Sequence, residues 1–276
     1  MKLPGIGEYR CVGADPLPVD SAPLRSRIAF AAAHVVADPT ADSTSAVDWD
    51  ATLRFRHHLW SLGLGIADAM DTAQRGMGLD WANARELIIR SGAEAASVGG
   101  RLACGAGTDQ LTGPATVDEV IAAYEEQVAL VEQAGAQVIL MASPALAAVA
   151  KGPEDYLAVY GKLLAQVREP VILHWLGPMF APALTGYWGS ADLDVATETL
   201  LELLRANATK IDGIKMSLLD ADRERALRAR LPAGVRMYTG DDFNYPDLIA
   251  EASDALLGIF DPIAPIAAAA LRALDV

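Results

Sequence analysis

A lysine within an apolar segment has the clearest chemical potential in this sequence. Lys215 lies in Gly213–Ser217, a short run that otherwise reads as a buried strand. Burying an ammonium group is costly, so such a lysine either pairs with a buried carboxylate, such as Asp71 or Asp241, or serves as a neutral amine nucleophile. The residue types alone leave both interpretations open.

Two histidines accompany apolar runs and could transfer protons. His174 lies within Val171–Leu176, and His34 follows the small-residue run Ala29–Ala33. Imidazole suits general acid–base catalysis because its ordinary pKa is near neutrality. For His174 we rank proton transfer ahead of a purely structural hydrogen bond, whereas for His34 the two roles remain open.

A divalent metal ion is the alternative use of these histidines. Imidazoles and carboxylates bind such ions, and Asp68, Asp71 and Asp241 could join His34 and His174. The sequence contains no H-x-H or H-E-x-x-H pattern, so we expect no bound metal and no other cofactor. A metal-dependent isomerase, epimerase or aldolase and a non-catalytic barrel remain the alternative functions.

Short apolar runs alternate with longer helical patterns along the chain. The expected strands are Arg27–Val36, Leu64–Met70, Gly100–Gly105, Gln137–Ala142, Val171–Leu176, Gly213–Ser217, Val235–Thr239 and Ala255–Phe260. This alternation is typical of parallel βα units and predicts an α/β fold, a (β/α)8 TIM barrel over residues 27–276. Residues 1–26 are expected to form an N-terminal arm. A doubly wound open sheet is the alternative fold.

The intervening segments carry helical patterns and helix-start signals. The expected helices are Trp49–Leu62, Trp81–Gly92, Val117–Ala134, Glu154–Val167, Leu193–Ala206, Asp222–Arg230, Pro246–Ala252 and Ile263–Leu274. Asp48 is expected to cap the first helix, and Thr116 with Glu119 has the form of a capping box. Because TIM-barrel sites form at the carboxyl ends of the strands, Lys215, His174, His34 and Asp71 are expected to converge there.

Five segments together resemble one known family. They are Gly105–Thr108, Ala134–Gln137 with Ser143-Pro144, Glu169–Leu173, Gly213–Ser217 and Tyr238–Asp242. In order and spacing these segments resemble the dihydrodipicolinate synthase/N-acetylneuraminate lyase family, over roughly residues 27–274. The resemblance implies a TIM barrel in which Lys215 forms a Schiff base with a keto-acid or keto-sugar, in a lyase or aldolase.

Two departures from the family pattern affect the expected site. The family's catalytic tyrosine follows the fifth strand, where this chain has His174, which would act as the acid–base group. The family's carboxylate-binding loop reads Asp71–Arg75 here, and Asp71 would repel a substrate carboxylate. Thr72 could still donate a hydrogen bond and Arg75 could supply a countercharge. Alternatively, the substrate is neutral there, such as a keto-sugar or polyol.

The remaining expected contacts come from neighbouring strand ends. Ser217 follows Lys215 on the same strand, His34 ends the first strand, and Asp241 follows the seventh. Together with Asp71, Thr72 and Arg75, these residues are expected to bind the substrate.

Composition narrows the partners. Hydrophobic residues make up 52% of the 276 residues, enough for a large core, and the net charge of −14 disfavours nucleic acid and anionic membranes. No apolar stretch reaches the roughly 18 residues that span a bilayer, and the first residues lack the apolar centre of a signal peptide. We expect a cytoplasmic homo-oligomer that acts on a small carbonyl compound.

Overall fold

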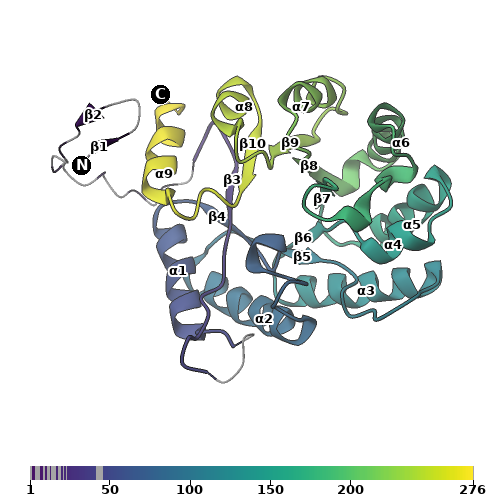
Figure 1. Cartoon of the computed structure of the whole chain (residues 1–276), viewed down its shortest axis with the longest axis horizontal. Coiled ribbons are helices and arrows are strands. Elements are labelled where there is room, and N and C mark those ends of the chain that lie inside the picture. Colours follow the sequence, from purple (N-terminus) through teal and green to yellow (C-terminus); the bar gives the residue numbers. More distant parts are fainter. Residues whose placement is uncertain are drawn as a thin grey trace.

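A closed ring of parallel strands forms the centre of the computed structural model (Figure 1). The structure describes residues 24–41 and 46–275, together with residues 2, 3, 7, 8, 10, 13, 17, 20 and 22. The strand order in the barrel is β10-β3-β4-β5-β6-β7-β8-β9, and β10 pairs with both β3 and β9. This closure confirms the predicted (β/α)8 TIM barrel and excludes the open-sheet alternative.

The barrel strands coincide with the eight apolar runs of the sequence. Their bounds are Ala29–Ala32 (β3), Gly65–Asp68 (β4), Leu102–Ala106 (β5), Gln137–Leu140 (β6), Val171–Leu176 (β7), Ile211–Ser217 (β8), Arg236–Thr239 (β9) and Asp254–Leu257 (β10). Several are shorter than the apolar runs, because those runs continue into the loops at the barrel ends. The apolar pattern therefore located each strand, and it gave the last residue correctly for β7, β8 and β9.

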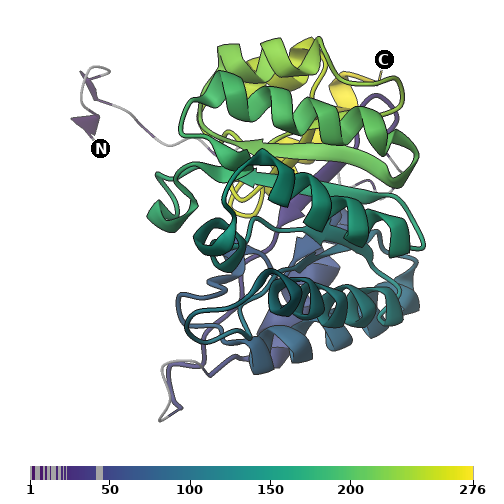
Figure 2. The same ribbon diagram turned by 90° about the vertical axis from the view of Figure 1, so that its right-hand side faces the viewer.

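Helices surround the strands on all sides, as the two views show together (Figures 1 and 2). Their bounds are Trp49–Ser61 (α1), Trp81–Val98 (α2), Val117–Gln133 (α3), Pro144–Val149 (α4), Pro153–Gln166 (α5), Leu193–Ala206 (α6), Ala221–Arg228 (α7), Tyr245–Glu251 (α8) and Ala264–Ala273 (α9). The short helix α4, between β6 and α5, was not predicted. Its six residues are too few for a helical period to be visible in the sequence.

Helix ends follow the predicted caps at α1 and α3. The Asp48 side chain accepts a hydrogen bond from the backbone of Ala51, and Thr116 and Glu119 form a reciprocal capping box. Helix α2 runs beyond Gly92, where the sequence prediction ended it. A Cβ at Gly92 would lie 2.5 Å from the Ala134 carbonyl oxygen, so this glycine permits close helix packing rather than ending the helix.

The core has two parts, one on each side of the strands. Side chains that point outward from the barrel pack against the helices and form the larger part. The smaller part fills the barrel interior, which is therefore packed rather than open. Its members are Phe30, Ala32, Ala67, Met70, Ala103, Ile139, Ile172, Tyr238 and Leu256.

The start of the described barrel is tied to its end. The backbone N–H groups of Arg25 and Ser26 donate to Asp275, the latter at 2.6 Å. Most of the predicted arm over residues 1–26 lies outside the described residues. Within it, Lys2–Leu3 (β1) and Gly7–Glu8 (β2) pair antiparallel, outside the ring of helices (Figure 2). Over the described part of the chain, no helix combines the length and apolarity needed to cross a bilayer.

Candidate active site

Strand register brings Lys215 and His174 side by side. In the pairing of β7 with β8, His174 lies directly opposite Lys215, and Leu176 lies opposite Ser217. Alternate residues of a strand point to the same face, and Ile172 on β7 belongs to the barrel interior. His174 therefore points inward, and Lys215 and Ser217 share this orientation. All three lie near the carboxyl ends of their strands.

The packed interior forms a floor beneath these side chains. Tyr238 lies opposite Lys215 on β9. Its hydroxyl donates a hydrogen bond to Asp212 at 2.6 Å, and its ring contacts Phe30 edge to face. A Cβ at Gly213 would lie 2.6 Å from the Tyr238 ring, so the absence of a side chain on β8 makes room for it. The floor closes the barrel below Lys215 and leaves only the carboxyl-end mouth as an approach.

Lys215 is buried without a matched charge. Its residue is 4% exposed. Among the described residues, no hydrogen bond or ion pair within 4.0 Å is made by its ammonium group. Gly240 shapes its surroundings, because a Cβ there would lie 2.8 Å from Lys215 Cε and 2.3 Å from Ser217 Oγ. The salt-bridged alternative for this lysine, with Asp71 or Asp241, is not what the structure shows.

His174 is fully buried and neutral. Its Nε2 atom lies 3.3 Å from Ser217 Oγ, whereas Nδ1 is buried without a hydrogen-bond partner among the described residues. Burial, reinforced by the charge of Lys215, lowers the pKa of His174 to about 3, against an opposing effect of Asp71. The ring therefore offers one N–H and one lone pair to a reactant at neutral pH.

Asp71 and Thr72 begin the turn after β4 and present unused polar atoms. Asp71 Oδ1 and Thr72 Oγ1 are buried and lack partners in the described part of the chain. Burial alone would raise the pKa of Asp71, but the nearby positive charge of Lys215 outweighs this effect, and the pKa lies below its usual value. Asp71 is therefore an ionised acceptor beside the lysine.

The two consecutive aspartates after β9 differ in their surroundings. Asp241 accepts hydrogen bonds from the backbone of Phe243 and Asn244 at 2.9 and 3.0 Å, so it stabilises the turn into α8. Asp242 shares the environment of Lys215 and Asp71. Burial is the main cause of its raised pKa, and its Oδ1 accepts from the Ile259 N–H at 3.2 Å.

No role of their own was assigned from the sequence to Asp242 or to two glycines, Gly240 and Gly258. A Cβ at Gly258 would lie 2.7 Å from Thr72 Cγ2 and 3.9 Å from Asp242 Oδ2, so Thr72 and Asp242 meet across it. A glycine directly after each of two adjacent strands was the available signal. It could have indicated a place where side chains from neighbouring strands crowd the backbone.

Three candidate residues, His34, Asp68 and Arg75, are bonded to other protein groups. His34 Nδ1 lies 2.6 Å from Asp261 Oδ2, and this hydrogen bond is the main cause of its raised pKa. Its side chain is half exposed at the mouth. Asp68, considered above as a metal ligand, points outward and pairs with buried Arg56 at 2.7 Å. It is thereby separated from the barrel interior.

Arg75 has no donor left for a substrate. An arginine carries five N–H donors, and here Nε and one Nη2 donor bond to Asp109 at 2.9 and 2.5 Å. Nη1 donates to the carbonyl oxygens of Ala69 and Gly105, and Nη2 also donates to Gln127. These contacts tie the loop after β4 to β5 and α3, so Arg75 serves mainly to hold the mouth of the barrel together.

A cavity of about 450 Å³ opens at the barrel mouth. Asp71 lines it, together with Arg75, Asp109 and Thr108, and apolar side chains such as Met141, Leu176 and Phe180. The volume suits a small-molecule site, and Asp71 links it to Lys215 and His174. Lys215 and His174 do not themselves line this cavity, and Asp71 is the lining residue whose charge interacts with both.

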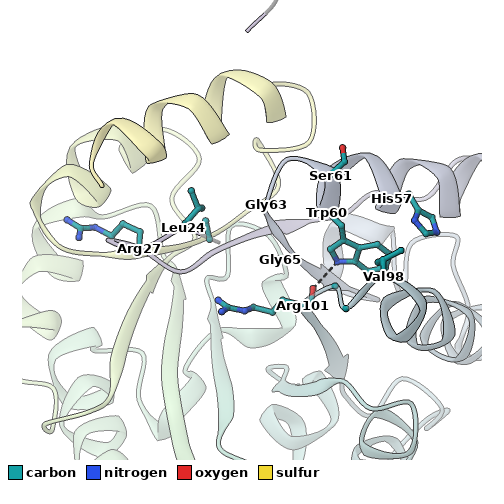
Figure 3. Close-up of a pocket in the computed structure, with 12 residues that line it drawn as sticks. Leu24, Arg27, His57, Trp60, Ser61, Gly63, Gly65, Val98 and Arg101 are labelled. Atoms are coloured by element: carbon teal, nitrogen blue, oxygen red, sulfur yellow. Dashed lines mark hydrogen bonds between the residues drawn. The ribbon is translucent and has the colours of Figure 1, made fainter. Parts of the chain in front are cut away.

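A larger cavity, about 700 Å³, lies at the opposite end of the barrel (Figure 3). It is lined by the first residues of β3 and β4 and by Trp60, whose ring nitrogen donates to the Arg101 carbonyl oxygen at 3.0 Å. His57, on its wall, pairs with Glu94 at 2.7 Å. Active sites of TIM barrels form at the carboxyl ends of the strands, so we place the candidate site at the mouth instead.

The described residues contain no group of three histidine, cysteine, aspartate or glutamate side chains that could hold a metal ion. Several of the carboxylates and imidazoles considered as metal ligands instead bond to other protein groups. Asp68 pairs with Arg56, His34 with Asp261, and Asp241 with the turn that follows it.

One family model matches the chain over residues 3–276, and its description is "Protein of unknown function (DUF993)". Among curated proteins, none matches in sequence. The family match covers the barrel and the segment before it, so it applies to the whole arrangement described above.

Solved structures share the fold at low identity. The 4-hydroxy-tetrahydrodipicolinate synthase of Methylacidiphilum fumariolicum is 18% identical with a TM-score of 0.67, covering 91% of this chain and 74% of that one. The dihydrodipicolinate synthase of Acinetobacter baumannii, complexed with pyruvate, is 18% identical with a TM-score of 0.68, covering 91% and 76%. The 2-keto 3-deoxygluconate aldolase of Picrophilus torridus is 14% identical with a TM-score of 0.63, covering 86% and 71%. At these identities the likeness shows the fold alone.

Proposed function

The chain belongs to the DUF993 family, and we propose that it is a Schiff-base-forming lyase or aldolase in which Lys215 binds a ketone substrate. The observation that carries the proposal is the lysine itself. It is 4% exposed, lacks an ion-pair partner among the described residues, and lies opposite His174 at the mouth of the barrel. A buried amine that makes no direct ion pair, even with the Asp71 carboxylate in its vicinity, is suited to nucleophilic catalysis.

The fold supports this reading as an analogy. Barrels of the same shape include two synthases and an aldolase named above, and the sequence segments around Lys215 resemble that family. Identity of 14–18% carries no residue roles by itself. The roles proposed below therefore rest on the contacts of this chain's own residues.

The proposed reaction begins with attack of the neutral Lys215 amine on the substrate ketone. Loss of water gives a protonated imine, which attracts electrons from the neighbouring carbon. When the bond between the α and β carbons breaks, its electron pair forms an enamine, the β-hydroxyl proton passes to a base, and an aldehyde leaves. Protonation of the enamine carbon and hydrolysis of the imine release the second product and regenerate the amine.

Dehydration is the other outcome open to the same imine. Removal of the α proton gives the enamine, and the β-hydroxyl then leaves as water. Both outcomes require a group that transfers a proton beside the lysine, and we assign this role to His174. Its ring is neutral, and Nδ1 has no partner among the described residues. The positive charge at Lys215 contributes to the low basicity of His174, so the loss of this charge as the imine becomes a neutral enamine makes the histidine a better proton acceptor.

The surrounding polar groups position the reactants. Ser217 Oγ, 3.3 Å from His174 Nε2, fixes the ring orientation. Thr72 and Asp71 have oxygens without partners among the described residues, and these can accept hydrogen bonds from substrate hydroxyls. Asp242, near Thr72 across Gly258, and the half-exposed His34 are further groups that can contact a substrate.

Exchange of substrate protons with solvent tests the proposal. Pyruvate, hydroxyacetone and dihydroxyacetone are each incubated with the protein in D2O, and deuterium at the α carbon is followed by NMR. We expect exchange with at least one ketone, loss of exchange in Lys215→Arg, and no effect of a metal chelator. Arginine keeps the charge but is not a nucleophile. Lys162→Arg, at an exposed lysine of α5, is the matched control.

Exchange that persists in Lys215→Arg would contradict the imine mechanism. Exchange that a chelator abolishes would favour metal-dependent enolisation instead. Absence of exchange with every ketone in a broader panel of keto-acids and ketoses would remove the support for a lyase.

A further inference from the structure

The charges around the mouth cavity limit what part of a substrate can lie there. Of the side chains that line the cavity, Arg75 is the only cation, and Asp71 and Asp109 are the carboxylates. Asp109 is paired with Arg75 through both of its oxygens. The remaining unpaired charge on the cavity wall is therefore negative and belongs to Asp71.

Arg75 cannot offset this charge for a bound carboxylate. All five of its N–H donors have protein acceptors, two of them backbone carbonyl oxygens of Ala69 and Gly105. Binding a substrate carboxylate would break one of these bonds and leave a buried acceptor without a partner, which is costly. The guanidinium is thus unavailable for the countercharge role that its position suggests.

The unsatisfied oxygens of the turn after β4, whose Asp71 interacts electrostatically with Lys215, can accept hydrogen bonds from a ligand. Asp71 Oδ1 is buried and without a partner in the described part of the chain, and an ionised carboxylate can only accept. Thr72 Oγ1 is likewise unpartnered and can accept or donate. Asp242 adds a second carboxyl group beside Thr72, across Gly258. A substrate with hydroxyl groups would satisfy these oxygens, whereas a carboxylate would add acceptors and repulsion.

We propose that the site binds a neutral hydroxyketone, such as a ketose or keto-polyol, with a hydroxyl group next to the carbonyl donating to Asp71, and that it discriminates against keto-acids. The inference rests on the proposed function, because Lys215 is taken as the group that binds the carbonyl carbon. Imine formation at Lys215 proceeds with loss of one water, as above. Asp71 is then the residue that selects between substrates according to the group next to their carbonyl carbon.

Two ketones of similar size test this inference directly. Dihydroxyacetone carries a neutral hydroxymethyl group where pyruvate carries a carboxylate. Each is titrated against the protein in the presence of cyanoborohydride, and the reduced adduct is measured by intact mass. We expect dihydroxyacetone to reach half-maximal adduct at a concentration at least about tenfold lower than pyruvate, since adjacent like charges oppose binding.

Asp71→Asn removes the charge and keeps the shape of the side chain. We expect it to improve pyruvate trapping about tenfold or more and to weaken trapping of dihydroxyacetone, so that the preference narrows or reverses. Glu202→Gln, at an exposed carboxylate of α6, removes the same charge away from the site and should leave the preference unchanged. If Asp71→Asn does not fold, the comparison of the two ketones in the unchanged protein decides alone.

The possible failures are distinguishable. Equal or better trapping of pyruvate by the unchanged protein, lost in Lys215→Arg, would overturn the inference and leave the proposed function standing. An improvement of pyruvate trapping in Glu202→Gln equal to that in Asp71→Asn would also overturn it, since net charge would then explain the effect. If no ketose or keto-acid gives an adduct that depends on Lys215, the proposed function itself fails.

Discussion

The protonation state of His174 is the residue-scale property on which the proposed proton transfers depend. A histidine that is buried at 0% exposure, next to a lysine, remains neutral well below its usual titration range. The neutral ring can accept the β-hydroxyl proton, and the nearby Asp71 carboxylate would stabilise the imidazolium that results. The proposed proton transfer therefore depends on three neighbouring side chains, with Asp71 remaining ionised while His174 gains the proton.

The low pKa of His174 predicts an acid-sensitive stability. In the unfolded chain His174 takes up a proton near pH 6.5, whereas in the folded protein it does so only near pH 3. The contribution of the neutral His174 to the free energy of unfolding is therefore complete above about pH 6.5 and is lost as the pH falls toward 3. Between pH 8 and pH 5 the loss should be about 2 kcal/mol.

Denaturant unfolding at a series of pH values measures this effect. His174→Gln should show a shallower loss of stability on acidification than the unchanged protein. His58→Gln, at an exposed position of α1, should retain the full slope. Parallel pH profiles for His174→Gln and the unchanged protein would mean that the imidazole titrates normally in the fold.

Gly240 provides a second prediction at the residue scale. Gly240→Ala would place a methyl group 2.8 Å from Lys215 Cε and 2.3 Å from Ser217 Oγ, so both side chains must shift. A displacement of about 1 Å in a reacting group can cost roughly a hundredfold in rate. We expect adduct formation or turnover to fall by about this factor in a protein that still folds.

Gly161→Ala is the matched control, because a Cβ in this position of α5 meets nothing within 4 Å. It should leave turnover unchanged and stabilise the helix slightly. Full activity in Gly240→Ala would show that the position of Lys215 does not limit the reaction.

Individual site residues could be predicted from the sequence only where strand position determined their role. Lys215 and His174 lie within clear apolar runs, and the inward register follows from the period of two. The engagement of all Arg75 donors could not be predicted, because Asp109 and Gln127 lie 34 and 52 residues away in the chain. The difference between Asp241 and Asp242 depends on a local turn that the sequence pattern does not determine.

At the scale of elements, the turn after β4 is held by a buried ion pair on its outer side. Arg56 of α1 donates to both Asp68 oxygens, at 2.9 and 2.7 Å, and both side chains have no exposed surface. Ser91 of α2 donates to the same carboxylate at 2.6 Å. The pair therefore links two helices to the strand whose next residues include Asp71 and Thr72.

Breaking this pair should destabilise the whole barrel. Arg56→Ala leaves the Asp68 carboxylate buried with only part of its hydrogen bonds, a change that typically costs about 3–5 kcal/mol. Arg230→Ala removes a half-exposed arginine paired with Glu198 and should cost no more than about 1 kcal/mol. Thermal or denaturant unfolding of the two variants measures the contrast, and equal losses would contradict the structural role assigned to Arg56.

The elements also show where sequence patterns were sufficient. The apolar runs and cap residues located the barrel strands and the starts of α1 and α3. They failed at Gly92 and at α4. In the first case a glycine reflects tight contact with Ala134, and in the second the helix is only six residues long. Both depend on tertiary packing, which a linear pattern does not contain.

At the scale of the whole molecule, barrel closure is what turns separate strand ends into one site. Lys215, His174 and Asp71 are spread over more than half of the sequence, yet β4, β7 and β8 present them around one mouth. The number and order of βα units predicted this arrangement, because parallel strands place their carboxyl ends together. Packed interior residues close the ring below the site, and the hydrogen bond from Ser26 to Asp275 joins the segment before β3 to the segment after α9.

The central claim is that Lys215 forms a covalent imine, and peptide mapping of the reduced adduct tests it most directly. The protein is treated with borohydride and a panel of ketoses and keto-acids, digested, and analysed by mass spectrometry. We predict that the added mass is found on the peptide containing Lys215 and is absent in Lys215→Arg, which should fold but not turn over. An adduct on another lysine, or activity that survives in Lys215→Arg, would contradict the account.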